Sequence, residues 1–256
     1  GFLGANGAGK TTTIKIVMGI QGATAGEVEI FGKNSLHAEA RRRIGFLPER
    51  PYFHMNLSAN EFLDFHRHLY GAPTEGKKWP ANEDLLKTVG LSKVGARLLR
   101  TFSKGMLQRI GIAQALISDP DLIVLDEPMS GLDPVGRREV RNLMLDLNRA
   151  GKTVFFSSHI LSDIESTCQR IAFLERGVLQ YCGKIDDLIS SSNQEFEILF
   201  QLDHEEGRRE LSKFGSLDTS GRQLRLIVKG RVEARQAMEK AWQQGAEIRD
   251  QPADSR

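Results

Sequence analysis

The chain has 256 residues, enough to bury one large core together with a small second one. Its composition, 40% hydrophobic and 27% charged, excludes a disordered chain. The 35 basic and 33 acidic side chains leave a net charge of +2. This balance is unlike that of a dedicated nucleic-acid-binding protein, so no direct contact with nucleic acid is expected.

A glycine-rich loop is the first motif along the chain, at residues 4–11, "GANGAGKT". It fits the pattern GxxxxGK(S/T), in which successive backbone N–H groups curl around phosphate oxygens. We expect Lys10 to bridge the terminal phosphates and Thr11 to place its hydroxyl on Mg²⁺. A glycine turn that only caps a helix is the alternative. The predicted phosphate-binding residues are Asn6, Gly7, Ala8, Gly9, Lys10, Thr11 and Thr12.

The next hundred residues predict alternating elements and then a helical region. Residues 11–20 predict a helix whose N-terminal dipole faces the phosphates. The stretches "GEVEIFGK" and "RRIGFLP" predict strands, and the second leads into Glu49. From Leu57 to about Pro120 the pattern is helical, interrupted by a Gly/Pro-rich loop at 71–80. We assign residues of about 52–118 to a helical subdomain.

The stretch "FSKGMLQR" at 102–109 lies near the end of this helical region. Ser103 is a natural N-cap for the helix that follows, and capping alone would explain it. A capped helix N-terminus is also an anion site, and Gly105 lets the backbone come close to a ligand. The residues by themselves leave both interpretations open.

The stretch "DLIVLDEP" at 121–128 predicts a strand that ends in two acids. Four apolar residues, Leu122 to Leu125, are typical of a strand covered on both faces, and the proline ends it. We expect Asp126 to hold Mg²⁺, which prefers oxygen ligands, and Glu127 to polarise the water that attacks the γ-phosphate. A simple strand-end turn is the alternative.

The rest of the chain predicts a continued α/β domain and a separate module. Helical spacing at 140–147 is followed by two strands, "TVFFSS" and "RIAFLERG". This alternation predicts an α/β fold with a mainly parallel sheet, over residues 1–190. Beyond "SSSN", alternating apolar residues, two helical stretches and a "TSGR" hairpin predict a small α+β module of βαββαβ type over 194–256.

Five motifs in this order resemble the ATP-binding cassette of ABC transporters, a P-loop NTPase. They are the glycine-rich loop, "FSKGMLQR", "LIVLDEP", "SGLD" at 130–133 and "SSH" at 157–159. "FSKGM" stands where the family signature is usually LSGGQ, and it departs from that signature at three of five positions. The resemblance implies that Ser103, Lys104 and Gly105 act in trans, closing the ATP site of an opposite subunit.

The resemblance assigns roles to three further residues. His159 resembles the switch histidine that contacts the γ-phosphate and orients the water with Glu127. Asp133 falls in the D-loop, which crosses the dimer interface in the family. Glu49 stands at the Q-loop position, where the family usually has a glutamine, and it would add a metal ligand to Thr11 and Asp126. The sequence leaves open whether the charge of Glu49 tightens Mg²⁺ binding or repels phosphate.

The implied function is an ATP-hydrolysing subunit that uses ATP and Mg²⁺ and forms an ATP-dependent head-to-tail homodimer. Its partners would be transmembrane permease subunits at the cytoplasmic face of the cell membrane. The C-terminal module is similar to that of bacterial ATPases serving ABC-2 type exporters, which favours an exporter. A soluble ATPase of the same superfamily, acting on ribosomes, DNA or iron–sulfur assembly, is the alternative. We expect a native N-terminal stretch, with the family's adenine-stacking aromatic residue, to precede Gly1.

Overall fold

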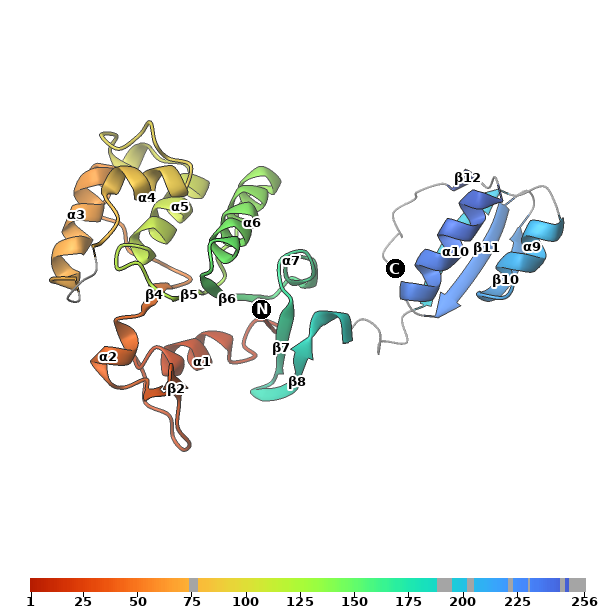
Figure 1. Ribbon diagram of the computed structural model, residues 1–256, viewed down its shortest axis with the longest axis horizontal. Coiled ribbons are helices and arrows are strands. Elements are labelled where there is room, and N and C mark those ends of the chain that lie inside the picture. Colours follow the sequence, from red (N-terminus) through yellow and green to blue (C-terminus); the bar gives the residue numbers. More distant parts are fainter. Residues whose placement is uncertain are drawn as a thin grey trace. The chain divides into compact units, whose positions relative to one another are not determined.

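The structure is a computed structural model that describes residues 1–73, 78–187, 195–201, 205–220, 223–229, 231–244 and 247–248. The chain divides into two compact units, Gly1–Cys182 and Gly183–Arg256, and each is described by itself (Figure 1). Part of the predicted 71–80 loop, the predicted module boundary at 190–194 and the last two residues of "TSGR" lie outside the described residues. Within the described ranges, no helix is both long and apolar enough to cross a membrane.

A six-stranded sheet forms the centre of the first unit, in the order β4-β5-β6-β1-β7-β8. The strands are β1 (Phe2–Leu3), β4 (Ile44–Leu47), β5 (Leu122–Leu125), β6 (Thr153–Ser158), β7 (Arg170–Glu175) and β8 (Val178–Lys184). Neighbours pair in parallel from β4 through β7. Arg176 and Gly177 join β7 to β8 with φ of 48° and 81°, as in a tight hairpin turn. The predicted α/β fold with a mainly parallel sheet is therefore confirmed.

Helices cover both faces of this sheet (Figure 1). Helix α1 (Lys10–Val17) lies on one face, where its Ile14 joins Val124 of β5 in one apolar cluster. Helices α5 (Lys104–Ala115) and α6 (Pro134–Arg149) lie on the opposite face. Helix α5 approaches β4 so closely that a Cβ at Gly45 would collide with the carbonyl oxygen of Ala115. The carboxyl ends of the parallel strands are left to loops, which is where ligands bind in open α/β sheets.

The region between β1 and β5 holds the smaller elements and three packed helices. These elements are β2 (Glu29–Ile30), β3 (Lys33–Asn34), α2 (Ala38–Arg41), α3 (Ala59–Tyr70), α4 (Asn82–Thr88) and the 3₁₀ turn η1 (Leu99–Thr101). A capping box starts α3: the Ser58 hydroxyl accepts from the Glu61 N–H, and the Glu61 carboxylate accepts from the Ser58 N–H. Helices α3, α4 and α5 contact one another, with Phe62 and Leu63 of α3 buried.

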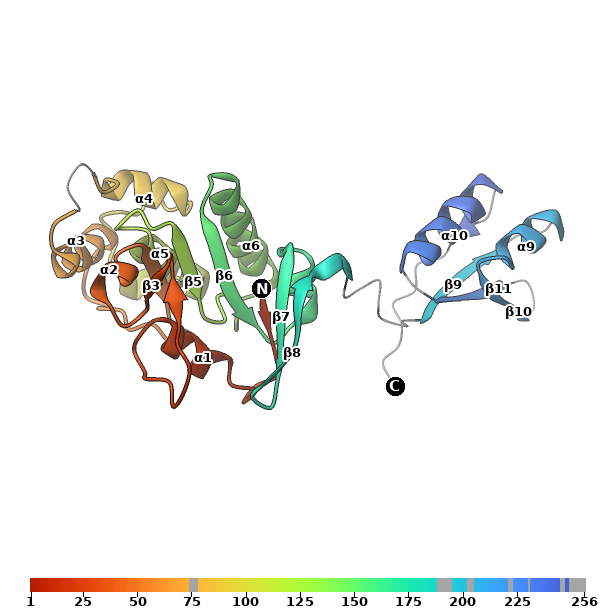
Figure 2. The same cartoon turned by 60° about the horizontal axis from the view of Figure 1, so that its bottom comes forward.

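Helix α6 connects the loop after β5 to β6. Asp133 caps it, because its carboxylate accepts the Gly136 N–H at 3.0 Å. Its predicted apolar face is buried, at Val140, Leu143, Met144 and Leu147. Figure 2 shows α6 beside β6. The short helix α7 (Leu161–Glu165) follows β6 and carries Asp163, a buried carboxylate paired with Arg137 and Arg141 of α6. These ion pairs fix α7 to α6.

The second unit contains a four-stranded antiparallel sheet in the order β10-β11-β9-β12. Its elements are β9 (Glu195–Gln201), α9 (Glu205–Leu211), β10 (Gly215–Ser220), β11 (Gln223–Lys229), α10 (Arg231–Gln243) and β12 (Glu247–Ile248). Leu211 of α9 and Ala237 of α10 share one core cluster with Phe200 and Leu226 of the sheet, so both helices cover the same face (Figure 2). The element order is that of a split βαβ unit of ferredoxin-like type.

Candidate active site

A polar cavity of about 430 Å³ lies at the carboxyl ends of the strands of the first unit. It brings together the loops that follow β1, β4, β5 and β6. Its lining residues are Asn6, Gly7, Gly9, Lys10, Thr11, Thr12, Glu49, Arg50, Glu127, Ser130 and His159. Nine of these eleven were predicted as site residues from the sequence, and Arg50 and Ser130 were not.

The glycine-rich loop wraps one side of this cavity in a conformation that needs glycine. Gly7 and Gly9 have φ of 80° and 104°, which side-chain-bearing residues rarely adopt. A Cβ at Gly4 would lie 2.6 Å from the carbonyl oxygen of Leu174. Ala8 is buried behind the loop, and its carbonyl accepts the Gly177 N–H at 3.0 Å. The first turn of α1 has no acidic side chain, so its N-terminus presents uncompensated N–H groups.

Lys10 places a cation at the edge of the loop. Its Nζ donates to the carbonyl oxygens of Gly4 at 2.7 Å and Ala5 at 3.2 Å. The same nitrogen lies 3.1 Å from Oε1 of Glu127. The Lys10 side chain is only 6% exposed. Lys10 therefore holds a fixed position between the phosphate loop and the predicted catalytic acid.

Glu127 is held in a strained backbone conformation. Its φ is 50°, in a region that costs a non-glycine residue about 1–3 kcal/mol. The Ser157 hydroxyl accepts the Glu127 N–H at 2.8 Å, and the Glu127 carbonyl accepts the Ser130 N–H at 3.0 Å. A strained residue persists only where the surrounding structure holds it in place. Such residues cluster at functional sites.

The two carboxylate oxygens of Glu127 have different surroundings. Oε2 lies 2.9 Å from Nδ1 of His159. Oε1 is buried beside the Lys10 ammonium, but it accepts no hydrogen bond from the described residues, because the contact with Lys10 is an ion pair outside hydrogen-bond geometry. A buried acceptor normally has a donor partner. Oε1 is thus held on the phosphate-loop side of the carboxylate, against the Lys10 ammonium.

Asp126 lies behind the cavity wall and is 1% exposed. The Ser157 hydroxyl donates to its Oδ1 at 2.6 Å. Its backbone N–H donates to the carbonyl of Leu47, the last residue of β4, at 2.9 Å. Ser157 therefore contacts both adjacent acids. Ser157 is part of the "SSH" motif, but the motif by itself predicts no role for it.

The oxygen donors at this cavity suit a divalent cation of the magnesium type. Thr11 and Glu49 line the cavity with a hydroxyl and a carboxylate. Asp126 adds a second carboxylate close behind it, with Oδ1 engaged by Ser157. Magnesium prefers hard oxygen ligands and usually keeps several waters, so a site with few protein donors fits it. These residues are compatible with Mg²⁺ bound together with phosphate.

Six predicted site residues do not line the cavity of their own chain. Ala8 and Asp126 are buried, and the other four are Ser103, Lys104, Gly105 and Asp133. Ser103 caps α5, since its hydroxyl accepts the Met106 N–H at 3.3 Å. Asp133 caps α6 in the same way. Both caps are local contacts within one chain, and a role at an opposite subunit stays a prediction.

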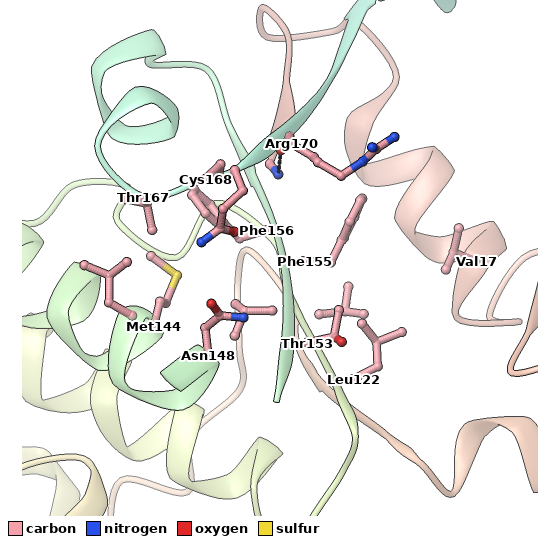
Figure 3. A pocket seen from close by; sticks show the side chains of 15 residues that line it. Val17, Leu122, Met144, Asn148, Thr153, Phe155, Phe156, Thr167, Cys168 and Arg170 are labelled. Atoms are coloured by element: carbon pink, nitrogen blue, oxygen red, sulfur yellow. Dashed lines mark hydrogen bonds between the residues drawn. The ribbon is translucent and has the colours of Figure 1, made fainter. Parts of the chain in front are cut away.

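A second cavity, of about 400 Å³, lies elsewhere in the first unit and has mostly apolar walls. Figure 3 shows Val17, Leu122 and Phe155 gathered on one side of it and Met144 on the other. It includes neither the phosphate loop nor Glu127 and His159. Apolar walls offer phosphate oxygens no partners. The candidate active site is therefore the polar cavity at the strand ends.

Comparison with known proteins places the chain in a family. The family described as ABC transporter matches residues 1–130, about half of the chain. This chain belongs to the ABC transporter family, as one of its ATP-binding domains. The motifs that resemble the ATP-binding cassette thus led to the right family.

Two relatives and one solved structure illustrate the similarity. An uncharacterized ABC transporter ATP-binding protein of Nostoc sp. strain PCC 7120 is 47% identical over 195 residues, covering 75% of this chain and 58% of the relative. The bacitracin transport ATP-binding protein BcrA of Bacillus licheniformis is 44% identical over 182 residues, which cover 70% of this chain and 58% of the relative. A solved structure of a dimeric ATP-binding cassette in a post-hydrolysis state, bound to ADP and Pi, is 26% identical with a TM-score of 0.62. The match covers 72% of this chain and 84% of that structure's chain. The chain spans 58% of the length of these two relatives.

Proposed function

We propose that this chain binds ATP with Mg²⁺ and hydrolyses its γ-phosphate, as the ATPase subunit of an ABC transporter. The observation that carries the proposal is the position of the Glu127 carboxylate. Glu127 lines the polar cavity, with Oε1 3.1 Å from the Lys10 ammonium of the phosphate loop and Oε2 2.9 Å from Nδ1 of His159. A carboxylate held between a phosphate-loop lysine and a histidine, at the wall of a polar cavity, has a position that suits a base for hydrolysis of a terminal phosphate.

Different residues of the chain bind the phosphates, hold the metal ion and accept the proton in this reaction. Lys10 and the N–H groups of the loop bind the β- and γ-phosphates, and Lys10 balances their charge. Thr11, Asp126 and Glu49 would hold Mg²⁺, which supplies further charge neutralisation when bound. Glu127 accepts the proton of the water that attacks the γ-phosphorus, while ADP leaves with the electron pair of the broken P–O bond. His159 fixes Glu127 through Oε2 and orients it toward that water.

A head-to-tail homodimer would complete each site. We assign Ser103, Lys104 and Gly105 to the γ-phosphate bound by the opposite subunit, and Asp133 to the interface between the two sites. The dimeric ADP-bound and Pi-bound relative supports this assembly. ATP would then favour the closed dimer by binding it more tightly than the open one.

Replacing Ser103 by arginine tests the trans assignment. Ser103→Arg should abolish ATP-dependent dimerisation, measured by sedimentation velocity, and leave ATP binding to the monomer unchanged. Ser92→Arg, at an exposed serine of the same helical region, is the matched control and should dimerise normally. Dimerisation of Ser103→Arg to the wild-type extent would overturn the trans assignment.

The membrane partner would be an exporter permease, which would hold the subunit at the cytoplasmic face of the membrane. The relative BcrA, a transport protein for bacitracin, supports an exporter. A groove of about 560 Å³, lined by residues 52–57 and Phe65, begins three residues after Glu49. Tyr52 in this groove is 79% exposed, as suits a surface that a partner covers.

Co-purification from membranes in mild detergent tests this partner. The wild-type protein should carry a multi-spanning membrane protein, and Tyr52→Asp should lose it. Leu179→Asp, at an exposed apolar residue of β8, is the control and should retain it. A wild-type preparation that carries no membrane protein would contradict the exporter assignment, while leaving ATP hydrolysis to be judged by its own assay.

A further inference from the structure

Two helix starts lie side by side, those of α5 and α6. A Cβ at Gly105 of α5 would lie 4.0 Å from the Cα of Gly136 in α6. Lys104, the first residue of α5, reaches across to the "SGLD" turn that precedes α6. A Cβ at Gly131 of this turn would collide with Nζ of Lys104 and lie 3.3 Å from its Cε. The Lys104 side chain therefore lies directly against Gly131.

The turn that Lys104 contacts is joined to the catalytic acid of the same chain. Ser130 precedes Gly131, lines the polar cavity, and donates its N–H to the Glu127 carbonyl at 3.0 Å. Gly131 has φ of 65°, so the turn depends on a conformation that only glycine adopts easily. A displacement of Gly131 would therefore also move Ser130 and the backbone of Glu127.

The charge of Lys104 is unbalanced within its own chain. It lies at the positive end of the α5 dipole, where cations are disfavoured, and the first turn of α5 has no acidic residue. Among the described residues, no carboxylate lies within ion-pair distance of its ammonium. Helix stability alone would favour an acidic residue at this position. Lys104 is exposed, so its ammonium is accessible to a group of a second subunit.

We propose that Lys104 is a positioning residue that couples the two ATP sites of the dimer. This inference rests on the proposed function, in which Lys104 faces the γ-phosphate held by the opposite subunit. The phosphate draws the ammonium away from Gly131, and the "SGLD" turn then shifts at Ser130 and Glu127. ATP in one site thereby adjusts the catalytic acid of the other through Lys104, Gly131 and Ser130, a contiguous chain of contacts within one subunit.

Steady-state ATP hydrolysis at varied ATP concentration tests the coupling. Lys104→Gln should lower kcat about 10-fold, leave KM within about twofold, and reduce the Hill coefficient from about 2 toward 1. Lys104→Arg keeps the charge and should restore cooperativity. Lys87→Gln, at an exposed lysine of α4, is the matched control and should behave as wild type.

A double substitution tests the contact itself. Gly131→Ala should lower kcat less in a Lys104→Gly background than in the wild type, because the colliding side chain is then absent. Equal losses in the two backgrounds, or a Lys104→Gln variant with wild-type kcat and Hill coefficient, would overturn the coupling while the proposed dimer stands. A wild-type chain that hydrolyses ATP as a non-cooperative monomer would overturn both.

Discussion

His159 and Glu127 are held together by a 2.9 Å contact between Nδ1 of the ring and Oε2 of the carboxylate. They come from the ends of neighbouring strands, β6 and β5, and both line the polar cavity. The contact fixes the rotation of the carboxylate, so that Oε1 is directed to the side where Lys10 lies. The orientation of the proposed base is therefore a property of the folded chain itself.

Ser157→Ala should weaken both folding and catalysis. The substitution removes the acceptor of the Glu127 N–H and the donor to Asp126 Oδ1, two buried groups. Leaving such groups unpaired costs about 1–3 kcal/mol, and kcat should fall because Glu127 is no longer held in its strained conformation. Urea unfolding and phosphate release measure the two effects. Ser166→Ala, at an exposed hydroxyl, is the control, and an equal loss in both variants would contradict the account.

Gly4→Ala should destabilise the phosphate loop, because the added Cβ would lie 2.6 Å from the Leu174 carbonyl oxygen. Overpacking of this kind typically costs about 1–3 kcal/mol. Gly22→Ala is the matched control, since no heavy atom lies within 4 Å of its Cβ position. Its unfolding free energy should change by less than about 1 kcal/mol. Thermal unfolding and ATP affinity check both variants, and a Gly4→Ala chain as stable as Gly22→Ala would refute the close packing.

The phosphate loop and the two strand-end acids could be predicted because their chemistry is local in the sequence. Ser157 could not, because its role depends on how two distant strands align. Leu125 of β5 pairs with Phe156 of β6, and this register brings Ser157 beside Asp126. The sequence contains no sign of that alignment.

The contact of Lys104 with Gly131 could not be predicted from the sequence, for a similar reason. It depends on the packing of α5 against α6, which separate motifs along the chain do not reveal. The sheet itself was predictable from its apolar strands and alternating helices. The predicted domain boundary at 190–194 stays a prediction, because it lies outside the described residues.

His66 should make the folded state less stable in acid. Its ring packs against Phe62 and Phe65, and burial, assisted by the nearby charge of His54, lowers its pKa. The unfolded chain, with a histidine pKa of about 6.5, then binds more protons than the folded chain. The contribution of neutral His66 to the unfolding free energy is fully present above the unfolded-state pKa. It is lost as the pH falls through the lower, folded-state pKa.

Urea unfolding at pH 7.5 and 5.5 measures this dependence. His66→Phe keeps an aromatic ring and should show a smaller loss of unfolding free energy at pH 5.5 than the wild type. His68→Gln, at an exposed histidine two residues further along α3, should retain the wild-type dependence. An unchanged pH dependence in His66→Phe would show that other groups account for it.

The most direct test of the proposed ATPase is Glu127→Gln, assayed for ATP binding and phosphate release on the same preparation. The amide keeps the size of the side chain but cannot accept the proton of the attacking water. We predict that ATP affinity is retained, that the ATP-bound dimer accumulates, and that phosphate release falls by about 10²–10⁴-fold. Undiminished phosphate release from a folded Glu127→Gln chain would contradict the assignment of Glu127 as the catalytic base.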